Sequence, residues 1–580
     1  TGPLGQGFAN GVGMALAERF LAALFNRPGH TLVDHHTYGI VSDGDLMEGV
    51  SAEAASLAGH LGLGKLIYLY DQNNITLAGS AALTYSENVL ARFSAYGWHV
   101  EQVRDGNDLA EIDAAIRRAR EQESRPSLIA VRTHIGFGSP HKQDSFEAHG
   151  APLGVAEVRL TKERLGWTAT EPFAVPDEAL AHLRQAVARG AVHEAAWRNR
   201  LAHYHEAHPA LAAEFERVLR GELPPGWEVQ LPEWDASAGP MATRRASGKA
   251  LAAVAGSLWN LVGGSADLNP STNTALAGRG DFQRPLAASA QAEAMAPIQG
   301  AAGGPWGWEG QNVHFGVREH AMGAILNGMA LHGGLLPYGA TFLVFADYMR
   351  APIRLAALMG LGVTYVFTHD SIAVGEDGPT HQPIEQLATL RAIPGLVVIR
   401  PADANETAQA WQVALAERRR PVALILSRQD LPVFDRPGQR LGGAEGMARG
   451  AYVLAEAADG AVAPPDLVLL GTGSEVALCL AARERLLDAG VRTRVVSMPS
   501  WELFNEQPLA YRAEVLGPAG TPRLAVEAGI AQGWHAYVGE RGAVLSIEHF
   551  GASAPGNEVL ARFGFTVENV VRRALELLPE

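Results

Sequence analysis

The sequence predicts three α/β domains, each built around a mainly parallel β-sheet. Short apolar runs that suit buried strands alternate with helical stretches along the whole chain. Two segments rich in proline and glycine, 221–240 and 432–450, interrupt this alternation and are expected to be exposed linkers. A chain of 580 residues is also too long for one hydrophobic core. We therefore predict domains at residues 1–225, 240–431 and 450–580.

Eight apolar runs are predicted to be buried strands of these sheets. They cover residues 66–70 and 128–131 in the first domain, 362–368, 396–399 and 422–426 in the second, and 467–470, 493–497 and 524–526 in the third. The segment 287–304, rich in glycine and alanine, has no clear period and is expected to form a surface insertion or loop. The pattern leaves the strand order open.

The composition argues against several classes of partner. Asp and Glu number 62 against 47 Lys and Arg, which gives a formal net charge of −15 and disfavours nucleic acid. A local group of Arg and His could still bind phosphate. No run of about 18 or more apolar residues is present, so no membrane partner is expected. The single cysteine, Cys479, lies in an apolar helical run, which predicts a buried thiol and fits a reducing, cytoplasmic compartment.

Polar residues follow two predicted strands of the first domain. Asp43 and Gly44 follow an apolar pair, and Asn73 follows the strand at 66–70. Open α/β sheets bind ligands at the carboxyl ends of their strands. Asp43 and Asn73 offer oxygen ligands for Mg²⁺, and Gly44 allows the backbone to approach a diphosphate. Asp-Gly and Asn-Asn are also common turn pairs, but the 29-residue step from Gly44 to Asn73 favours a site.

In the second domain, Glu319 precedes the apolar helical run 324–331. A carboxyl group in an apolar setting has a raised pKa and suits shared proton occupancy. The alternative is an ordinary acidic residue that favours the positive end of a helix dipole. Phe342, Phe345 and Tyr348 have helical spacing, and such aromatic residues are more often core than ligand contacts.

Several strings resemble the transketolase family, whose members use thiamine diphosphate. They are residues 1–7, 46–60, 145–153, 316–323, 368–383 and, in the third domain, 471–475, 550–555 and 563–566. The step from Gly44 to Asn73 resembles the thiamine-diphosphate motif, with Ser42 in place of its first glycine. The chain opens with Thr1 inside a family motif, so an N-terminal segment is expected to be missing. By this resemblance, 1–225 is a diphosphate-binding domain, incomplete at its start, 240–431 a pyrimidine-binding domain and 450–580 a C-terminal scaffold domain.

The resemblance implies thiamine diphosphate as cofactor, with Mg²⁺, or Ca²⁺ or Mn²⁺ in its place. The metal ligands would be Asp43, Asn73 and the carbonyl oxygen of Ile75. Glu319 would bind the pyrimidine ring nitrogen, so that the 4′-amino group of the cofactor removes the C2 proton. The other cofactor contacts would be Gly2, Leu4, Gly44, Asn73, His149, Phe342, Phe345 and Tyr348, with Phe345 stacked on the pyrimidine.

The dense polar string 368–383 is implied to line the substrate channel; the alternative is a solvated loop. His149 and His381 would contact sugar hydroxyls and move protons, which makes them catalytic together with Glu319. Asp377 would read the configuration at C2 of the sugar. The phosphate group would be bound by Arg244, Ser271, His369 and Arg428, although isolated arginines are usually surface residues.

The function implied is reversible transfer of a two-carbon ketol group between sugar phosphates, through a thiamine-bound carbanion or enamine, in the pentose phosphate pathway. Xylulose 5-phosphate would be a donor, and ribose 5-phosphate or erythrose 4-phosphate an acceptor. The resemblance also implies a homodimer with shared active sites and with Glu48 and Glu53 at the subunit interface. The alternatives are a relative similar to dihydroxyacetone synthase and a truncated, non-catalytic relative with the same fold. The shortened chain alone is expected to be poorly soluble or weakly active.

Overall fold

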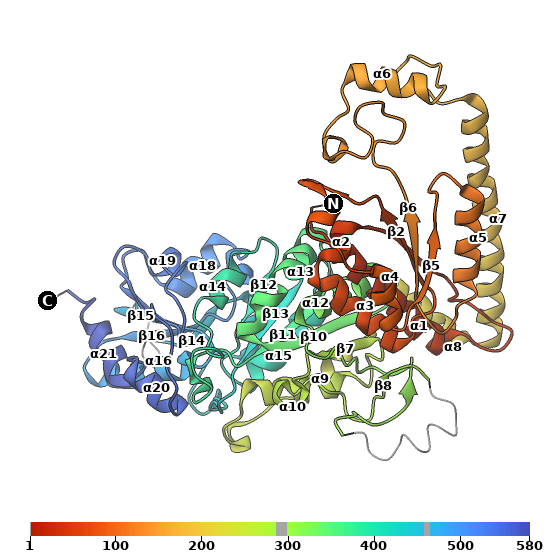
Figure 1. Cartoon of the computed structure of the whole chain (residues 1–580). Helices are drawn as coiled ribbons and strands as arrows, with labels where there is room; N and C mark the ends of the chain where they lie inside the picture. Colours follow the sequence, from red (N-terminus) through yellow and green to blue (C-terminus); the bar gives the residue numbers. More distant parts are fainter. Residues whose placement is uncertain (1, 286–298, 458–463, 580) are drawn as a thin grey trace.

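The computed structural model describes residues 2–285, 299–457 and 464–579, and three large β-sheets follow one another along this part of the chain (Figure 1). Helices cover each sheet, and all but one of the strand pairs within these sheets are parallel. The predicted fold class is therefore confirmed. Residues 287–298 of the expected surface insertion lie outside the described residues, and 299–304 form no helix or strand.

The first sheet has the strand order β1-β2-β6-β5, and its strands are parallel. They span Thr37–Ser42, Leu66–Gln72, Ser127–Arg132 and His99–Val103 respectively, so the predicted strands at 66–70 and 128–131 are confirmed. A small antiparallel pair, β3 (Ile75–Thr76) and β4 (Gly79–Ser80), follows β2. The helices are α1 (Gln6–Phe25), α2 (Asp43–Met47), α3 (Gly49–Leu61), α4 (Val89–Ala95), α5 (Leu109–Arg120), α6 (Val155–Arg164), α7 (Asp177–Ala207) and α8 (Pro209–Leu219).

The second sheet has the order β12-β13-β11-β10-β7 and is parallel and fully buried. Its strands span Val397–Ile399, Val422–Leu426, Thr364–Thr368, Leu336–Phe342 and Leu261–Ser265. The strands predicted at 362–368, 396–399 and 422–426 are confirmed. A short pair, β8 (Asp281–Phe282) and β9 (Trp306–Gly307), lies outside this order. The helices are α9 (Thr243–Val254), α10 (Asn269–Thr272), α12 (Glu319–His332), α13 (Ala346–Met359), α14 (Gln386–Arg391) and α15 (Ala404–Ala416).

The third sheet has the order β14-β16-β15-β17-β18, in which only β14 is antiparallel to its neighbour. Its strands span Tyr452–Ala455, Thr493–Ser497, Leu467–Gly471, Arg523–Val526 and Ala543–Leu545, which confirms the predicted strands. The expected burial of Cys479 is also confirmed. The helices are α16 (Glu475–Asp488), α17 (Trp501–Asn505), α18 (Leu509–Leu516), α19 (His535–Val538), α20 (Gly556–Arg562) and α21 (Val567–Leu575).

Helices α1 and α12 join the first two sheets through a contact between their backbones. A Cβ atom added at Gly13 would lie 2.0 Å from the carbonyl oxygen of Ile325, and one at Gly328 would lie 2.0 Å from that of Asn10. One hydrophobic core includes residues of both helices. By length and hydropathy, α1 alone among the described helices could cross a membrane, but 67% of that stretch is buried inside the protein, as in a core helix.

The expectation that 221–240 and 432–450 are exposed linkers is wrong in part. Trp227, Phe434 and Met447 are buried in the core of the second sheet. Proline and glycine indicate an irregular backbone, but they do not prevent an aromatic or aliphatic side chain from packing.

Candidate active site

The predicted diphosphate loop begins at the carboxyl end of β1, where Ser42 caps α2. The Ser42 hydroxyl accepts a hydrogen bond from the backbone of Asp45, and the Asp45 carboxylate accepts one from the backbone of Ser42 at 2.9 Å. This reciprocal capping box stabilises a helix start that a glycine could not cap with a side chain. Asp45 also accepts a hydrogen bond from the backbone of Gly5 at 3.0 Å, which ties the opening string to this loop.

Asp43 lies in the wall of this loop with only 2% of its surface exposed. The Tyr70 hydroxyl donates to one carboxylate oxygen, and the backbone of Asn74 donates to the other at 2.9 Å. Burial raises the pKa of Asp43, because desolvation disfavours its charged form. The Asn73 side-chain oxygen accepts from the backbone of Ile75 at 2.9 Å. Asp43 therefore lies beside the Asn73 turn, as predicted.

These residues fit a divalent cation. A buried carboxylate costs free energy when it is charged, and a cation held next to it would offset that cost. Among the residues with a described structure, no three His, Cys, Asp or Glu side chains converge on a possible metal site. The predicted donor set has only one carboxylate, with an amide oxygen and a backbone carbonyl, so phosphate and water oxygens would have to complete it.

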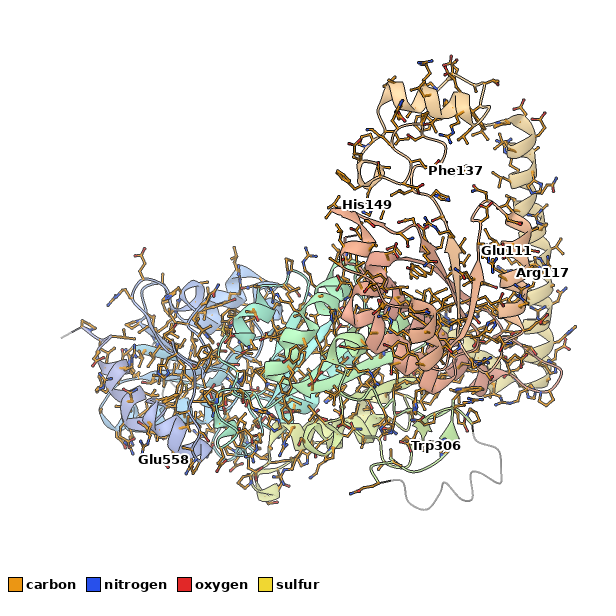
Figure 2. All side chains as sticks on the ribbon, viewed as in Figure 1. Glu111, Arg117, Phe137, His149, Trp306 and Glu558 are labelled. Atoms are coloured by element: carbon orange, nitrogen blue, oxygen red, sulfur yellow. The ribbon has the colours of Figure 1, made fainter. Side chains whose placement is uncertain are left out.

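Gly44 and Leu4 approach each other in the same loop, since a Cβ atom at Gly44 would lie 3.1 Å from a Leu4 methyl group. Gly2 has open space around its α-carbon. We call Leu4, Asp43, Gly44, Asn73 and Ile75 the diphosphate half-site. His149 lies on the long connection between β6 and α6, where it is half-buried (Figure 2).

Glu319 is the first residue of α12. Burial raises the pKa of its carboxyl group, and the negative charge of Glu53 adds to this rise. Thr341, near the end of β10, lies 3.5 Å from one carboxyl oxygen. Glu319 lines an open cleft of about 840 Å³ together with Glu53, His320 and Tyr348. A raised pKa favours the protonated form of this carboxyl group more than in a carboxyl group exposed to water.

Three aromatic rings form a stacked row at the end of β10 and the start of α13. Phe342 and Phe345 have ring centroids 5.9 Å apart, and Phe345 and Tyr348 have centroids 5.8 Å apart. Phe342 is buried, but Tyr348 is 61% exposed. The interpretation as ordinary core residues is therefore wrong for Tyr348, and the row offers a flat apolar surface beside Glu319.

Two predicted substrate histidines pack on this row. The His369 ring stacks on Phe342 with centroids 3.7 Å apart, and the His381 ring meets the edge of Phe345 at 5.8 Å. Burial, with the positive charges of Arg244 and Arg428, lowers the pKa of His369 to about 3. His369 is thus neutral at pH 7 and can donate a hydrogen bond without adding a charge.

Arg244 and Arg428 lie near enough to His369 for their charges to lower its pKa. Arg244 donates to the backbone carbonyl of Ser271 at 2.7 Å, which places that serine in the same group. Burial and the charge of Arg428 lower the pKa of Arg244, because the two cations repel each other. Asp377 lies on the exposed part of the loop that carries His381. We call the following set the substrate half-site: Arg244, Ser271, Phe342, Phe345, Tyr348, His369, His381 and Arg428.

The structure also reveals residues that the sequence did not indicate. Tyr70 and Asn74 hold the Asp43 carboxylate, and Thr341 lies beside Glu319. Tyr70 could have been noticed because it stands near the end of a predicted strand, next to the polar Asp71-Gln72 pair. No comparable signal marks Thr341.

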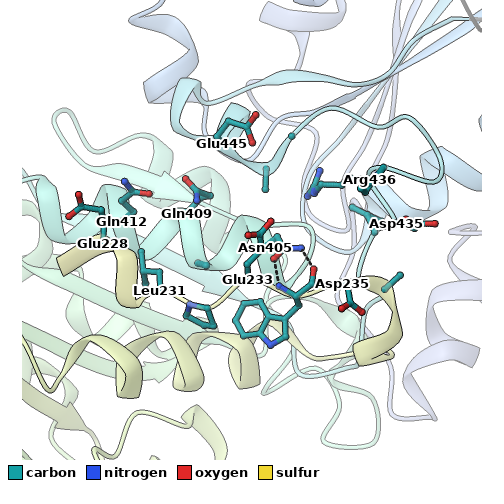
Figure 3. Close-up of a pocket in the computed structure, with 18 residues that line it drawn as sticks. Glu228, Leu231, Glu233, Asp235, Asn405, Gln409, Gln412, Asp435, Arg436 and Glu445 are labelled. Atoms are coloured by element: carbon teal, nitrogen blue, oxygen red, sulfur yellow. Dashed lines mark hydrogen bonds between the residues drawn. The ribbon is translucent and has the colours of Figure 1, made fainter. Parts of the chain in front are cut away.

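A separate cavity of about 690 Å³ lies between α15 and the segments 228–236 and 434–445 (Figure 3). Acidic side chains such as Glu228, Glu233 and Asp435 surround it, and Asn405 bonds the backbone of Trp234 at its wall. None of the predicted site residues lines this cavity, so it is distinct from both half-sites.

Comparison with protein families matches the three regions in order. Residues 1–224 match the transketolase thiamine diphosphate binding domain, 239–433 the transketolase pyrimidine binding domain, and 450–566 the transketolase-like C-terminal domain. These matches define a class of enzyme that binds thiamine diphosphate through the first two domains.

Individual relatives narrow this class. The transketolase of Geobacillus stearothermophilus is 54% identical over 579 residues, which cover 100% of this chain and 83% of the relative. The structure of the transketolase from Leishmania mexicana is 44% identical in sequence and has a TM-score of 0.91. The match covers 100% of this chain and 82% of the Leishmania chain. That of Pichia stipitis transketolase in complex with sedoheptulose 7-phosphate has a TM-score of 0.92 and 40% identity, with coverages of 100% and 81%. The chain belongs to the transketolase family, whose members are transferases.

Proposed function

We propose that this enzyme reversibly transfers a two-carbon ketol group from a ketose phosphate, such as xylulose 5-phosphate, to an aldose phosphate, such as ribose 5-phosphate or erythrose 4-phosphate. The observation that carries this proposal is the pair of Arg244 and Arg428 beside neutral His369. Two mutually repelling cations in a partly buried site favour a doubly charged anion. The solved complexes of the Pichia stipitis enzyme with xylulose 5-phosphate and sedoheptulose 7-phosphate support the same substrate class.

The diphosphate half-site would hold the cofactor through a divalent cation, with Mg²⁺ as the proposed ion. Thiamine diphosphate, when bound, supplies the nucleophilic carbon that carries the two-carbon unit. Asp43, Asn73 and the carbonyl oxygen of Ile75 would bind the cation, and Gly44, which has no side chain, would let the diphosphate approach the backbone. Gly2, Leu4 and His149 remain proposed contacts of the cofactor.

Glu319 would hold a proton at the pyrimidine ring nitrogen, because its raised pKa keeps the carboxyl group ready to share one. The stacked row of Phe342, Phe345 and Tyr348 would orient the ring and exclude water from one side of it.

The substrate half-site would orient the sugar by its phosphate. Arg244, Arg428, His369 and Ser271 would bind the phosphate group, which fixes the position of the reacting carbon. His381 and His149 would move protons at the sugar hydroxyls, and Asp377 would select the configuration at C2. We place this reaction in the pentose phosphate pathway and in the cytoplasm; the single buried cysteine supports a reducing compartment.

We also propose a homodimer whose active sites are shared, with the diphosphate half-site of one copy facing Glu319 and the substrate half-site of the other. In the described part of the chain, no hydrogen bond or ring contact joins the two half-sites. Tyr348 is exposed at the edge of the cleft that contains Glu319, so this surface is open to a second copy. Glu53 accepts a hydrogen bond from Ala321 within the same chain, at the start of α12.

The metal proposal can be tested at Asp43. We expect Asp43→Ala to weaken binding of thiamine diphosphate in the presence of Mg²⁺ by more than about tenfold, because a ligand of the cation is lost. Calorimetric titration with and without Mg²⁺ measures this. Asp108→Ala, which removes an exposed helix cap, is the matched control and should bind normally. Equal binding by the wild-type protein with and without a divalent cation would contradict the proposal.

The role of Glu319 can be tested without turnover. We expect Glu319→Ala to slow hydrogen–deuterium exchange at C2 of bound thiamine diphosphate by about 10² to 10⁴, the usual effect of a positioned acid or base. Nuclear magnetic resonance of the quenched cofactor measures this exchange. Glu309→Ala, an exposed carboxylate in the same domain, should exchange at the wild-type rate. Wild-type exchange in Glu319→Ala would refute the role.

The substrate class can be tested by turnover of xylulose 5-phosphate with ribose 5-phosphate. We expect Arg244→Ala to raise KM for phosphorylated sugars. The rise should correspond to a loss of about 1.5 to 3 kcal/mol of binding free energy, the range for a lost charged hydrogen bond. An unphosphorylated acceptor should be little affected. Arg245→Ala is the matched control, because Arg245 is exposed and pairs with Asp430. Equal losses with both kinds of acceptor would argue against phosphate recognition by Arg244. A wild-type protein that does not turn over this pair of sugar phosphates would argue against the proposed ketol transfer.

The shared site can be tested by complementation. When Asp43→Ala and Glu319→Ala chains are co-expressed, a mixed dimer with shared sites contains one intact site. We then expect about a quarter of the wild-type active sites in a random mixture. Each variant alone should be inactive. If the co-expressed chains stay as inactive as the separate ones, both halves of the site come from one chain.

A further inference from the structure

The third domain reaches the loop that carries the substrate residues. This substrate loop, residues 369–383, contains His369, Asp377 and His381, and it lies against residues 550–556, which we call the C-terminal loop. The Ser553 hydroxyl donates to the backbone carbonyl of Glu376 at 2.5 Å, next to Asp377. A side-chain amide donor of Gln382, next to His381, lies 3.0 Å from the carbonyl oxygen of Ala552.

Glycines on both sides permit this close approach. A Cβ atom at Gly556 would lie 2.4 Å from the carbonyl oxygen of Ala373, and one at Gly551 would lie 1.8 Å from the Gln382 side chain. In the substrate loop, Gly375 has φ +88° and a Cβ atom there would lie 3.0 Å from the backbone nitrogen of Gly556. At Gly556 and Gly375 the two backbones therefore touch without an intervening side chain, and a shift of one displaces the other.

Gln382 connects this contact with the shape of the substrate loop. Its amide group is buried and also lies 2.9 Å from the carbonyl oxygen of Gly375 and 3.2 Å from that of Ile372. One side chain thus holds both ends of the loop and the C-terminal loop. Gly375 and Gly378 both have positive φ angles, which glycine adopts without the steric cost that a side chain would add, so the shape of the loop depends on these two glycines.

A buried ion pair makes a second connection at the base of the substrate loop. Arg400, which follows β12, donates to the Asp370 carboxylate at 2.8 and 3.0 Å and also pairs with Glu475 at the start of α16. The Arg400 and Asp370 side chains are no more than 1% exposed. Asp370 directly follows His369, so an arginine clamped to the third domain fixes the backbone beside a phosphate-binding residue.

We propose that the third domain positions the substrate loop, with Ser553 and Gly556 as positioning residues that act on Asp377 and His381. The proposal rests on the proposed function, because it assumes that the substrate loop binds the sugar. Neither residue needs to touch the substrate. They act through the backbone contacts of Glu376 and Ala373, which lie within the loop.

The test uses the holoprotein with all three domains and two variants with matched controls. Gly556→Ala forces the contact with Ala373 apart, and Gly190→Ala, on exposed α7 with nothing within 4 Å, is its control. Ser553→Ala removes the hydroxyl that bonds Glu376, and Ser546→Ala, whose hydroxyl bonds Glu548 in the same domain, is its control. The readouts are amide hydrogen exchange of residues 372–382, kcat/KM for xylulose 5-phosphate and affinity for thiamine diphosphate with Mg²⁺.

We expect both test variants to exchange faster at 372–382 than their controls, with unchanged exchange at 319–332 and unchanged cofactor affinity. A displaced loop should lower kcat/KM for the sugar phosphate by about tenfold to a hundredfold in Gly556→Ala, and less in Ser553→Ala. If hydrogen exchange becomes faster throughout the third domain of Gly556→Ala, the measurements on Ser553→Ala alone test the proposal. The proposal would be overturned if Ser553→Ala and a correctly folded Gly556→Ala both had the same hydrogen exchange at 372–382 and the same kcat/KM as their controls. An inactive wild-type protein would instead overturn the proposed function, while the exchange data would still show whether the third domain holds the loop.

Discussion

The contact between α1 and α12 sets the geometry on which both halves of the candidate site depend. At Gly13 and Gly328 the two helix backbones leave no room for a side chain. The helices also meet at their N-terminal ends, where Gln6 and His320 lie within hydrogen-bonding distance at 2.7 Å. Helix α1 begins directly after the loop held by Asp45, and α12 begins with Glu319. Helices that touch at the backbone have little freedom to slide, so this pair fixes the diphosphate loop relative to Glu319 within one chain.

Both half-sites, and Glu319 between them in the proposed dimer, contain groups whose charges are poorly compensated. Burial raises the pKa values of Asp43 and Glu319. Burial and the positive charge of Arg428 both lower the pKa of Arg244. Each of these groups would be more stable exposed to water or next to an opposite charge. In the proposed function, a metal ion would compensate Asp43, a shared proton would compensate Glu319, and the phosphate of the sugar would compensate the two arginines. Such departures from ordinary folding rules are expected at functional sites.

All eight apolar runs that were predicted as strands form strands, but other strands were missed, among them two that contain glycine or proline. Residues 261–265 and 336–342 form buried strands although they contain glycines and a proline, because Gly263 packs against the backbone of Tyr338. Proline and glycine are poor strand formers in isolation, and only the neighbouring strand explains their presence. The roles of Arg400 and of the C-terminal loop were also not predictable, since their partners lie far along the chain and leave no periodic signal.

The candidate site could be predicted to the extent that its residues lie in short strings at strand ends. The strings supplied Asp43, Asn73 and Glu319, and the structure brings Asp43 to the Asn73 turn. The strings did not show why Ser42 can replace a glycine. Its side chain caps α2, and the loop closes around Asp45 instead. A turn residue is therefore replaceable when the new side chain supplies a bond that the backbone can use.

The buried ion pair of Arg400 and Asp370 is better explained by a need to fix the position of the substrate loop than by a contribution to the stability of the protein. Removing charged groups from water costs several kcal/mol for each ion, and apolar side chains of similar volume often stabilise a protein as well as a buried ion pair does. An apolar contact would not fix the direction of the Asp370 carboxylate, whereas the guanidinium binds it with two donors and Glu475 with others. Directional bonds at this place restrain the backbone next to His369. The cost of burying these charges is therefore consistent with a need to hold the substrate loop in one form, and a domain without predicted catalytic residues supplies Glu475, the second carboxylate partner of Arg400.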